Sequence, residues 1–486
     1  GVDLTGIDLS GVDLTYANLK GADLTGADLS GVDLTGVDLK DADLTGAEFT
    51  GITGVLFSCP DSVPCEGGIL FVPGADYSHP SWKEKTIGFT GDVCSLNHYD
   101  DLINLEGVNV SGMKFRGKLC GVNFRGADLT DVQFHYVVHS DLSNADMSRA
   151  VIGRQPRSGN FDHVNLTNTI MRNVIMHTRN FRYNIMINAD ASSIIMDFYG
   201  LEYSSYATSN NFTGANFTNA HIRRVSFGDG IGHGSDFTGA DLTNADLTAV
   251  LFDYSTFTDA DLTGADLSGA EFIGADLTDA NLRDADLSGA DLKGATLTDA
   301  DLTGVRGQLK ACPSVMDNGV LCANNYLVGP GGDLTDTNLT GANLTGANLT
   351  HVKGKLEACP LYMDNGVKCA NKYLAGPGID LTGVDLRGAD LTGADLTGAD
   401  LTGVRGQLEA CPLHMDTEFQ CAKKYLVGPG ANLTGVDLTG ANLTGVRGQL
   451  QACPSVMDSG VLCANNYLVG PGVDLTDATL TGASIS

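Results

Sequence analysis

The sequence has few aromatic side chains and few basic ones. Aromatic residues make up 7% of its 486 residues, and 29 Lys plus Arg face 59 Asp plus Glu, for a formal net charge of -30. A surface of this charge repels phosphate backbones and anionic headgroups, so we expect no nucleic-acid partner. No run of about 18 apolar residues is present, so we also expect no membrane span. Because the sequence opens at Gly1 with neither Met nor an apolar leader, we expect any signal peptide to have been removed.

Residue patterns typical of catalysis are missing as well. The ten His fit no zinc-hydrolase spacing, and there is no Gly-rich phosphate loop and no nucleophile elbow. Arg306, Arg405 and Arg447 recur at one position of a longer repeat, which repetition alone explains. We therefore expect a protein that is not an enzyme and that holds no cofactor.

What the sequence has in abundance is a period of five residues. Residues 1–50 are consecutive pentads of Gly, a small residue, Asp, Leu and Thr, with Phe49 in place of the last Leu. Five fits neither the α-helical period nor that of a long strand. Within a pentad, however, the small residue and Leu alternate with Asp and Thr, which predicts a short strand followed by a corner. A chain that repeats this unit must coil.

This pattern resembles the pentapeptide-repeat family, whose motif is Ala, Asp or Asn, Leu and two variable positions. The resemblance implies an all-β fold, a right-handed quadrilateral parallel β-helix with four pentads per coil. Its central Leu or Phe and the small residue two positions before it would point inward. The pentads recur along most of the chain, so we expect one continuous solenoid rod.

Composition divides the chain into four stretches. Residues 1–50 are regular pentads, and 51–105 hold a degenerate cysteine module with an irregular insert. Residues 106–304 are pentads with an irregular middle rich in Met and His, and 305–486 are pentads interrupted by four cysteine modules. The modules have equal length and end in Gly-Pro-Gly; they cover 305–332, 352–379, 404–431 and 446–473.

Each module carries two Cys at the same spacing. In the first, residues 316–319 predict a turn between two arms, with Cys312 and Cys322 placed symmetrically about it. We favour a disulfide across this hairpin over a metal site, because zinc ligands are usually closer in sequence and have His or Cys partners nearby. The predicted pairs are Cys312 with Cys322, Cys359 with Cys369, Cys411 with Cys421, and Cys453 with Cys463.

Four further Cys complete an even set. Gly51–Pro60 aligns with Gly304–Pro313, which predicts a shortened fifth copy of the module with Cys59 and Cys65 as its pair. Elimination then leaves Cys94 with Cys120. Neighbouring cysteine pairs suit an oxidising compartment, so we expect a protein that is extracellular, secreted or on a cell surface.

Nine Asn-x-Ser/Thr sequons agree with a secretory route. Asn-Leu-Thr also arises whenever Asn replaces Asp in a pentad, so the sequons are weaker support than the cysteines. They lie at the outward position beside the core Leu, where a glycan has room. The candidate acceptors are Asn109, Asn165, Asn211, Asn216, Asn338, Asn343, Asn348, Asn432 and Asn442.

Stacked coils would align their Asp side chains in columns. Such columns could bind Ca²⁺ weakly at the surface, but a high-affinity site gathers six to eight oxygens on a shaped loop. We therefore interpret them as solvated acidic faces.

These features together predict a non-enzymatic extracellular structural protein. We expect copies to associate head to tail into a filament, sheath or surface appendage, with other surface or matrix proteins as further partners, because open coil ends expose unpaired strand edges. One alternative that the resemblance implies is an acidic rod that mimics duplex DNA and binds a topoisomerase, to inhibit or protect it. Another is a secreted adhesin or matrix protein that binds cations or glycans. The cysteine pairs argue against the DNA mimic.

Overall fold

The computed structural model describes residues 1–61, 65–66, 69–70, 72, 75–76, 86–88, 103–116, 118–153, 159–197, 207–223, 225–228, 234–317 and 319–485. These residues form an all-β structure without helices. Accordingly, none of them belongs to a helix that could cross a bilayer. The chain forms two compact units: unit 1 is Gly1–Asn281 with Ala290–Ala300, and unit 2 is Leu282–Gly289 with Asp301–Ser486.

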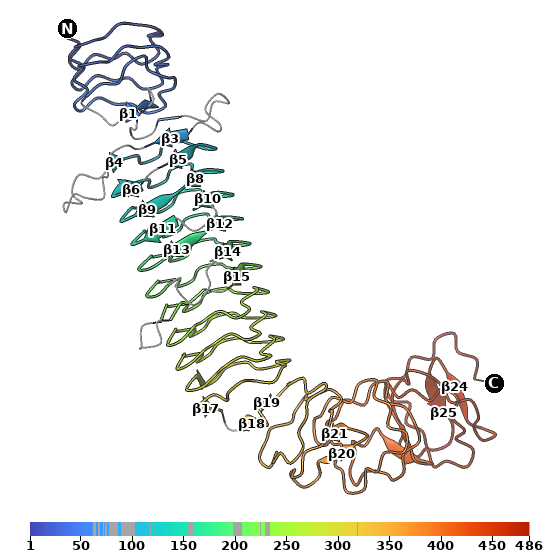
Figure 1. Cartoon of the computed structure of the whole chain (residues 1–486). Coiled ribbons are helices and arrows are strands. Elements are labelled where there is room, and N and C mark those ends of the chain that lie inside the picture. The colour runs from blue at the N-terminus through green and yellow to red at the C-terminus, as the bar shows by residue number, and fades with distance from the viewer. Residues whose placement is uncertain are drawn as a thin grey trace. The chain divides into compact units, whose positions relative to one another are not determined.

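Both units consist of coils of the chain stacked in parallel (Figure 1). In regular stretches the Asp of one pentad forms a parallel bridge with the residue twenty positions later, as Asp3 does with Asp23 and Asp261 with Asn281. Twenty residues are four pentads, so each coil has four short sides. The predicted all-β solenoid with four pentads per coil is confirmed.

A β-turn closes each side of a coil. The N–H of Ile7 donates to the carbonyl of Leu4, and Gly6 between them has a φ of 63°. Gly adopts this left-handed conformation without strain, and Asn and Asp tolerate it better than most residues, so Asn244 and Asp279 replace Gly at equivalent corners. Backbone conformation therefore favours Gly, Asn and Asp at the corner of the pentad, although other residues such as Ala249 and Tyr254 also adopt it.

The core is a stack of central Leu or Phe residues alternating with small ones. Leu267, Ala270 and Phe272 are each at most 1% exposed. Phe replaces Leu at many centres of unit 1, and the rings form a continuous column. The centroid of Phe237 lies 4.6 Å from that of Phe212 and 4.8 Å from that of Phe257. These rings exclude water from the centre of unit 1.

The irregular part of unit 1 contains longer strands in parallel sheets (Figure 1). One sheet has the order β15 (His221–Arg223), β14 (Ile195–Asp197), β12 (Ile175–Met176), β10 (Val151–Ile152), β8 (Gln133–Phe134), β5 (Lys114–Arg116) and β3 (Thr86–Gly88). Another has the order β13 (Thr178–Asn180), β11 (Gly159–Asp162), β9 (Tyr136–Val138) and β6 (Lys118–Cys120). Shorter pairs are β4 (Ile103–Asn104) with β7 (Val122–Asn123), and β1 (Cys65–Glu66) with β2 (Ile69–Leu70).

A ladder of buried polar side chains supports the coils of unit 1 that are longer than twenty residues. Asn184, Asn210, Ser235 and Ser255 take the inward position that Ala usually fills, and each is at most 3% exposed. The N–H of Asn184 donates to Oδ1 of Asn210 at 2.9 Å, and the N–H of Asn210 to Oγ of Ser235 at 3.3 Å. In a regular coil the equivalent N–H bonds the carbonyl three residues back, so here a side chain supplies the missing acceptor.

The cysteine modules are themselves coils of the solenoid. Arg405 forms a parallel bridge with Asp385, twenty residues earlier, as an ordinary pentad would. One coil further on, the spacing is larger, since Arg447 bridges Asp474 at a separation of 27. Each module is therefore a coil with seven extra residues. Two short strands, β16 (Thr296–Leu297) and β17 (Val315–Met316), lie near the start of the first module.

A β-hairpin accommodates the extra residues of each module. The four hairpins pair β18 (Leu321–Ala323) with β19 (Tyr326–Val328), β20 (Lys368–Ala370) with β21 (Tyr373–Ala375), β22 (Gln420–Ala422) with β23 (Tyr425–Val427), and β24 (Leu462–Ala464) with β25 (Tyr467–Val469).

The predicted position of the hairpin turn is wrong. The turn consists of Asn324 and Asn325, with φ of 49° and 65°, as a two-residue type I′ turn requires. In the hairpin ladder Cys322 stands opposite Leu327, not opposite Cys312. The earlier segment makes a separate turn, in which the N–H of Val320 donates to the carbonyl of Asp317.

We predict that the Phe column is essential to unit 1. Phe237→Ala should lower the free energy of unfolding by about 3–5 kcal/mol, because a ring surrounded by other rings leaves a cavity. Phe237→Leu restores the usual centre of a pentad and should cost less than about 1.5 kcal/mol. Urea unfolding followed by circular dichroism measures both, and equal losses for the two variants would contradict the prediction.

Candidate functional site

Disulfides join the module cysteines in neighbouring segments. The bonds are Cys59–Cys65, Cys312–Cys322, Cys359–Cys369, Cys411–Cys421 and Cys453–Cys463. Cys120 is also disulfide-bonded, and its expected partner Cys94 lies outside the described residues. Each of the four module bonds closes a loop with a sequence separation of 10. Closing such a loop is worth roughly 2.5 to 3 kcal/mol in the chain-entropy model.

Each module disulfide clamps a hairpin to the coil that carries it. Cys322 lies in β18, the first strand of the hairpin. Cys312 lies ten residues earlier in the same module coil, outside the hairpin. The hairpin turn bonds that coil too, since the carbonyl of Asn325 accepts the N–H of Leu309 at 2.7 Å. Lys372, Lys424 and Asn466 repeat this contact in the other modules, with Leu356, Leu408 and Leu450.

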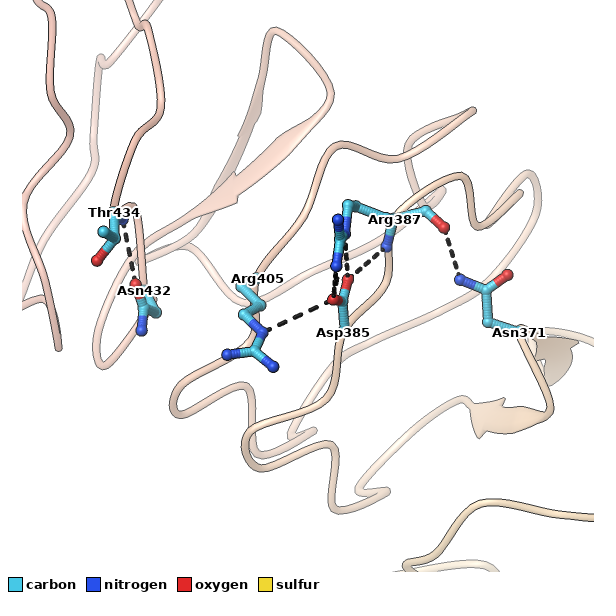
Figure 2. Close-up of polar contacts among 6 residues, drawn as sticks. All are labelled: Asn371, Asp385, Arg387, Arg405, Asn432 and Thr434. Atoms are coloured by element: carbon cyan, nitrogen blue, oxygen red, sulfur yellow. Dashed lines mark hydrogen bonds and ion pairs between the residues drawn. The ribbon is translucent and has the colours of Figure 1, made fainter.

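In three modules the turn also binds the following coil. The side-chain amide of Asn371 donates to the carbonyl of Arg387 at 2.8 Å (Figure 2). Asn324 reaches the carbonyls of Asn338 and Thr340 in the same way, and Asn465 those of Thr479 and Thr481. The third module has Lys423 at this position. The hairpins therefore brace consecutive coils of unit 2.

Basic residues of the modules pair with Asp one coil earlier. Nε of Arg306 is 3.1 Å from Oδ2 of Asp286, and Nε of Arg405 is 3.7 Å from Oδ2 of Asp385. Asp385 also accepts Nη2 of Arg387 at 2.7 Å (Figure 2). The hydrogen bonds from Arg387, with the charge of both Arg, lower the pKa of Asp385 to about 2.

These ion pairs correct the interpretation of the recurring Arg as repetition alone. Arg306 and Arg405 stand twenty residues after their Asp partners, which is one coil, so this spacing in the sequence was the signal that could have found the pairs. Arg447 instead lies 3.6 Å from Glu418 and from Asp477. Each of the three Arg thus offsets part of the negative charge of its own face.

The Asp columns are organised by local hydrogen bonds. Oδ1 of Asp3 accepts the N–H of Thr5 at 3.1 Å and its hydroxyl at 2.7 Å, and Thr439 bonds Asp437 in the same way. These bonds favour the ionised carboxylate and lower the pKa of both Asp3 and Asp437. They explain why Thr or Ser so often stands two residues after Asp. Among the described residues no group of three or more His, Cys, Asp or Glu is arranged to hold a metal ion.

The nine sequon Asn occupy the Asp position of their pentads. Oδ1 of Asn432 accepts the N–H of Thr434 at 3.1 Å (Figure 2), and the others make the same contact two residues on. Four are exposed, and these are Asn338, Asn343, Asn348 and Asn442. The remaining five are partly buried. Glycosylation stays a prediction, for which the exposed Asn are the favoured acceptors.

Comparison with a family description, pentapeptide repeats, matches the chain eight times. The matched residues are 1–31, 17–51, 103–151, 233–269, 270–306, 330–353, 377–405 and 429–447, together about half of the chain. No curated protein sequence matches it.

Several solved structures are similar to parts of the chain. Trypsin-treated QnrB1, a plasmid-mediated fluoroquinolone resistance protein, is 18% identical and covers 40% of this chain and 91% of its own, with a TM-score of 0.29. A pentapeptide repeat protein from the Arabidopsis thaliana thylakoid lumen is 30% identical over 22% of this chain and 65% of its own, with a TM-score of 0.18. HetL from Nostoc sp. strain PCC 7120, a pentapeptide repeat protein involved in heterocyst differentiation regulation, is 22% identical over 60% of this chain and 90% of its own, with a TM-score of 0.13. TM-scores this low support no conclusion about the fold or function of this chain.

Acid is expected to loosen the coils. Because the pKa values of Asp3, Asp385 and Asp437 are lowered in the folded state, the unfolded chain binds more protons as the pH falls below about 4. Stability is therefore present above that pH and is lost progressively as the pH falls through the folded pKa values. Thermal unfolding followed by circular dichroism between neutral pH and about pH 2 tests this. A melting temperature that does not change over this range would contradict it.

The hydrogen bond between a hairpin turn and the following coil can be tested by substitutions at the turn position that differs between the modules. Asn371→Asp keeps a residue suited to the left-handed turn but removes the amide donor, so it should cost about 1 kcal/mol of local stability. The reciprocal Lys423→Asn should slow exchange in the third hairpin, because it supplies the amide that this module lacks. Hydrogen exchange of the hairpin amides measures both. Unchanged protection in both variants would mean that the turn does not brace the coils.

Proposed function

Because the chain belongs to the pentapeptide-repeat family, we propose that it is a non-enzymatic structural protein that works outside the cell as a stiff solenoid. Family membership alone does not specify a role, since one fold hosts many functions. The proposal therefore depends on features of this chain that the pentad does not require.

The observation that carries the proposal is the repeated bracing of the module coils. Four times, a disulfide joins two segments of one module coil, and the hairpin turn of that coil is bonded to it. In three of the four, the turn also bonds the next coil. A single binding or catalytic site needs one such support, whereas a load-bearing or protease-resistant solenoid benefits from many. Resistance of neighbouring coils to separation is what this repetition would provide.

The disulfides also support an extracellular setting. Several disulfides in one chain persist where thiols are not kept reduced, as in secreted and cell-surface proteins. Sequons on the exposed faces of unit 2 are compatible with that route. We place the protein in the extracellular space or on a cell surface.

We further propose that copies assemble into a filament, sheath or surface appendage. Coils within each unit stack through the same parallel backbone bridges again and again, so a coil of another copy could add through the same contact. A head-to-tail contact joins two different surfaces, does not close, and therefore propagates. Other surface or matrix proteins are further proposed partners.

The net charge of -30 favours a second candidate, an acidic rod that binds a topoisomerase. Such a protein would act inside cells, where disulfides are rare. Its function should therefore survive reduction of every disulfide, which separates it from the extracellular structural protein.

Electron microscopy of the unreduced protein over a dilution series tests the structural role. We expect unbranched fibres that shorten on dilution, that persist with a calcium chelator, and that are lost or weakened after reduction with dithiothreitol. Discrete monomers or dimers at every concentration would contradict self-assembly. Inhibition of a topoisomerase by the fully reduced protein would support the second candidate instead.

A further inference from the structure

A tight turn precedes the hairpin of the second module. The N–H of Val367 donates to the carbonyl of Asp364 at 3.1 Å, so Asn365 and Gly366 are the two central residues of this turn. Gly366 has a φ of 91°, in the left-handed region that the second central residue of a type II turn occupies. The centre of the turn is therefore the dipeptide Asn-Gly.

The structure accounts for the Gly of this pair. A Cβ on Gly366 would lie 3.1 Å from Cβ of Asp395, which belongs to the following coil. The carbonyl of Gly366 accepts the N–H of Asp395 at 2.8 Å. The close approach and the left-handed φ both favour a residue without a side chain. This turn is thus a further contact by which the second module holds the coil after it.

The structure does not account for the Asn in the same way. In the fourth module the N–H of Val461 donates to the carbonyl of Asp458 at 3.1 Å, and Gly460 has a φ of 95°. The residue before Gly460 is Ser459. Because Ser forms the same turn, the amide of Asn is not needed to build it.

Asn-Gly occurs at two places in the sequence, and both are at this position of a module. The other is Asn318-Gly319 of the first module, where Asn318 lies outside the described residues. Gly319 has a φ of 90° and accepts the N–H of Asn348 at 2.7 Å, as Gly366 does that of its partner. The third module has Thr417 there.

The two reactive groups of the second pair are unengaged. The side chain of Asn365 is exposed, and it makes no hydrogen bond to any described residue. The N–H of Gly366 likewise has no acceptor in the described part of the chain. Both residues line a hollow of about 580 Å³, together with Leu361 and Lys368, so solvent reaches the amide and the adjoining N–H.

An exposed Asn amide beside an unengaged backbone N–H can close a succinimide ring. The backbone nitrogen of Gly366 bonds to Cγ of Asn365 while the bond from Cγ to Nδ2 breaks, and Nδ2 leaves as ammonia with the proton of that N–H. Water then opens the ring. Opening at Cγ gives aspartate, and opening at the backbone carbonyl gives isoaspartate, whose chain runs through Cγ. Glycine favours the attack because no side chain shields its nitrogen or restricts its backbone.

We propose that Asn365-Gly366 is a site of spontaneous deamidation that releases this turn from the following coil as the protein ages. Isoaspartate adds a methylene to the backbone at the centre of the turn, which separates the Gly366 carbonyl from the N–H of Asp395. Aspartate instead adds a carboxylate to a hollow that Asp364 and Asp395 already line, and like charges repel. The release needs only water, and it does not depend on assembly of the protein.

Asn371 of the same module provides an internal comparison. It is also exposed, but its amide donates to the carbonyl of Arg387 at 2.8 Å, and Lys372 follows it. A bonded amide next to a residue with a side chain forms a succinimide slowly. Asn365 and Asn371 therefore share exposure and differ in the features on which the reaction depends.

Ageing of the intact, unreduced protein at mildly alkaline pH tests the site. After ageing, reduction and digestion with trypsin place Asn365 in peptide Leu356–Lys368 and Asn371 in peptide Cys369–Lys372. Mass spectrometry, with unaged protein digested in parallel as the blank, should find Asn365 converted at least about tenfold faster than Asn371, a barrier lower by about 1.4 kcal/mol. Equal rates at the two Asn would overturn the proposal.

The release of the turn is read separately, by hydrogen exchange at the N–H of Asp395. Its protection should fall in the aged protein in proportion to the fraction converted. The matched control is Asn365→Ser, which takes the residue of the fourth module and should keep full protection on ageing. Equal loss of protection in this variant would overturn the role of Asn365, and conversion of Asn365 without loss at Asp395 would overturn the release.

Discussion

The parallel bridge between a residue and the one twenty positions later is the contact on which the whole structure depends. It places the outward residue of one pentad above that of the next coil, often Asp above Asp or Asn, and it aligns the central Leu and Phe in the core. The bridge can recur only if every coil returns the chain to the same side. Asn343 and Tyr362 are 19 residues apart rather than twenty. This shift of one residue lies within the module coil and is not passed on to the next plain coil.

Regular periodicity made the coils predictable, whereas contacts between coils decided the rest. Leu267 and Ala270 are buried where the pentad puts them. The hairpin turn was misplaced because Asn-Gly is a stronger local turn signal than Asn-Asn, and in the third module the turn is Lys423-Lys424, at φ of 49° and 66°. Nothing local favours Lys there. The bond from the N–H of Leu408 to the carbonyl of Lys424 holds that conformation, so tertiary structure overrides preference.

Charge is accommodated at the level of the single pentad. The predicted Asp columns exist, but the carboxylates accept bonds from the Thr or Ser that follows, as Asp437 does from Thr439. The sequence shows this pattern as the repeated Asp-Leu-Thr, but it does not show that the Thr hydrogen-bonds the carboxylate. The Arg and Asp pairs were equally accessible once a coil of twenty was assumed, because Arg306 follows Asp286 by that interval. The spacing of the Cys residues predicted the disulfides from the sequence. The buried ladder of Asn184 and Asn210 could not be predicted in this way, because only the contacts between neighbouring coils explain it.

The third module starts at Val404, 52 residues after the second, which is one pentad more than the 47 residues between the starts of the first two, and this pentad shows how the architecture can evolve. Inserting or deleting five residues keeps the inward and outward positions in register, although residues bridged across the change receive new partners, and it turns the following coils by one of the four sides. Ordinary folds lose stability when their length changes within a core element, because the register of side chains is broken. Here a length change in units of five instead steers a surface feature to a new azimuth. A gain or loss of one pentad thus turns the outward side chains of a module to another side while the fold is preserved.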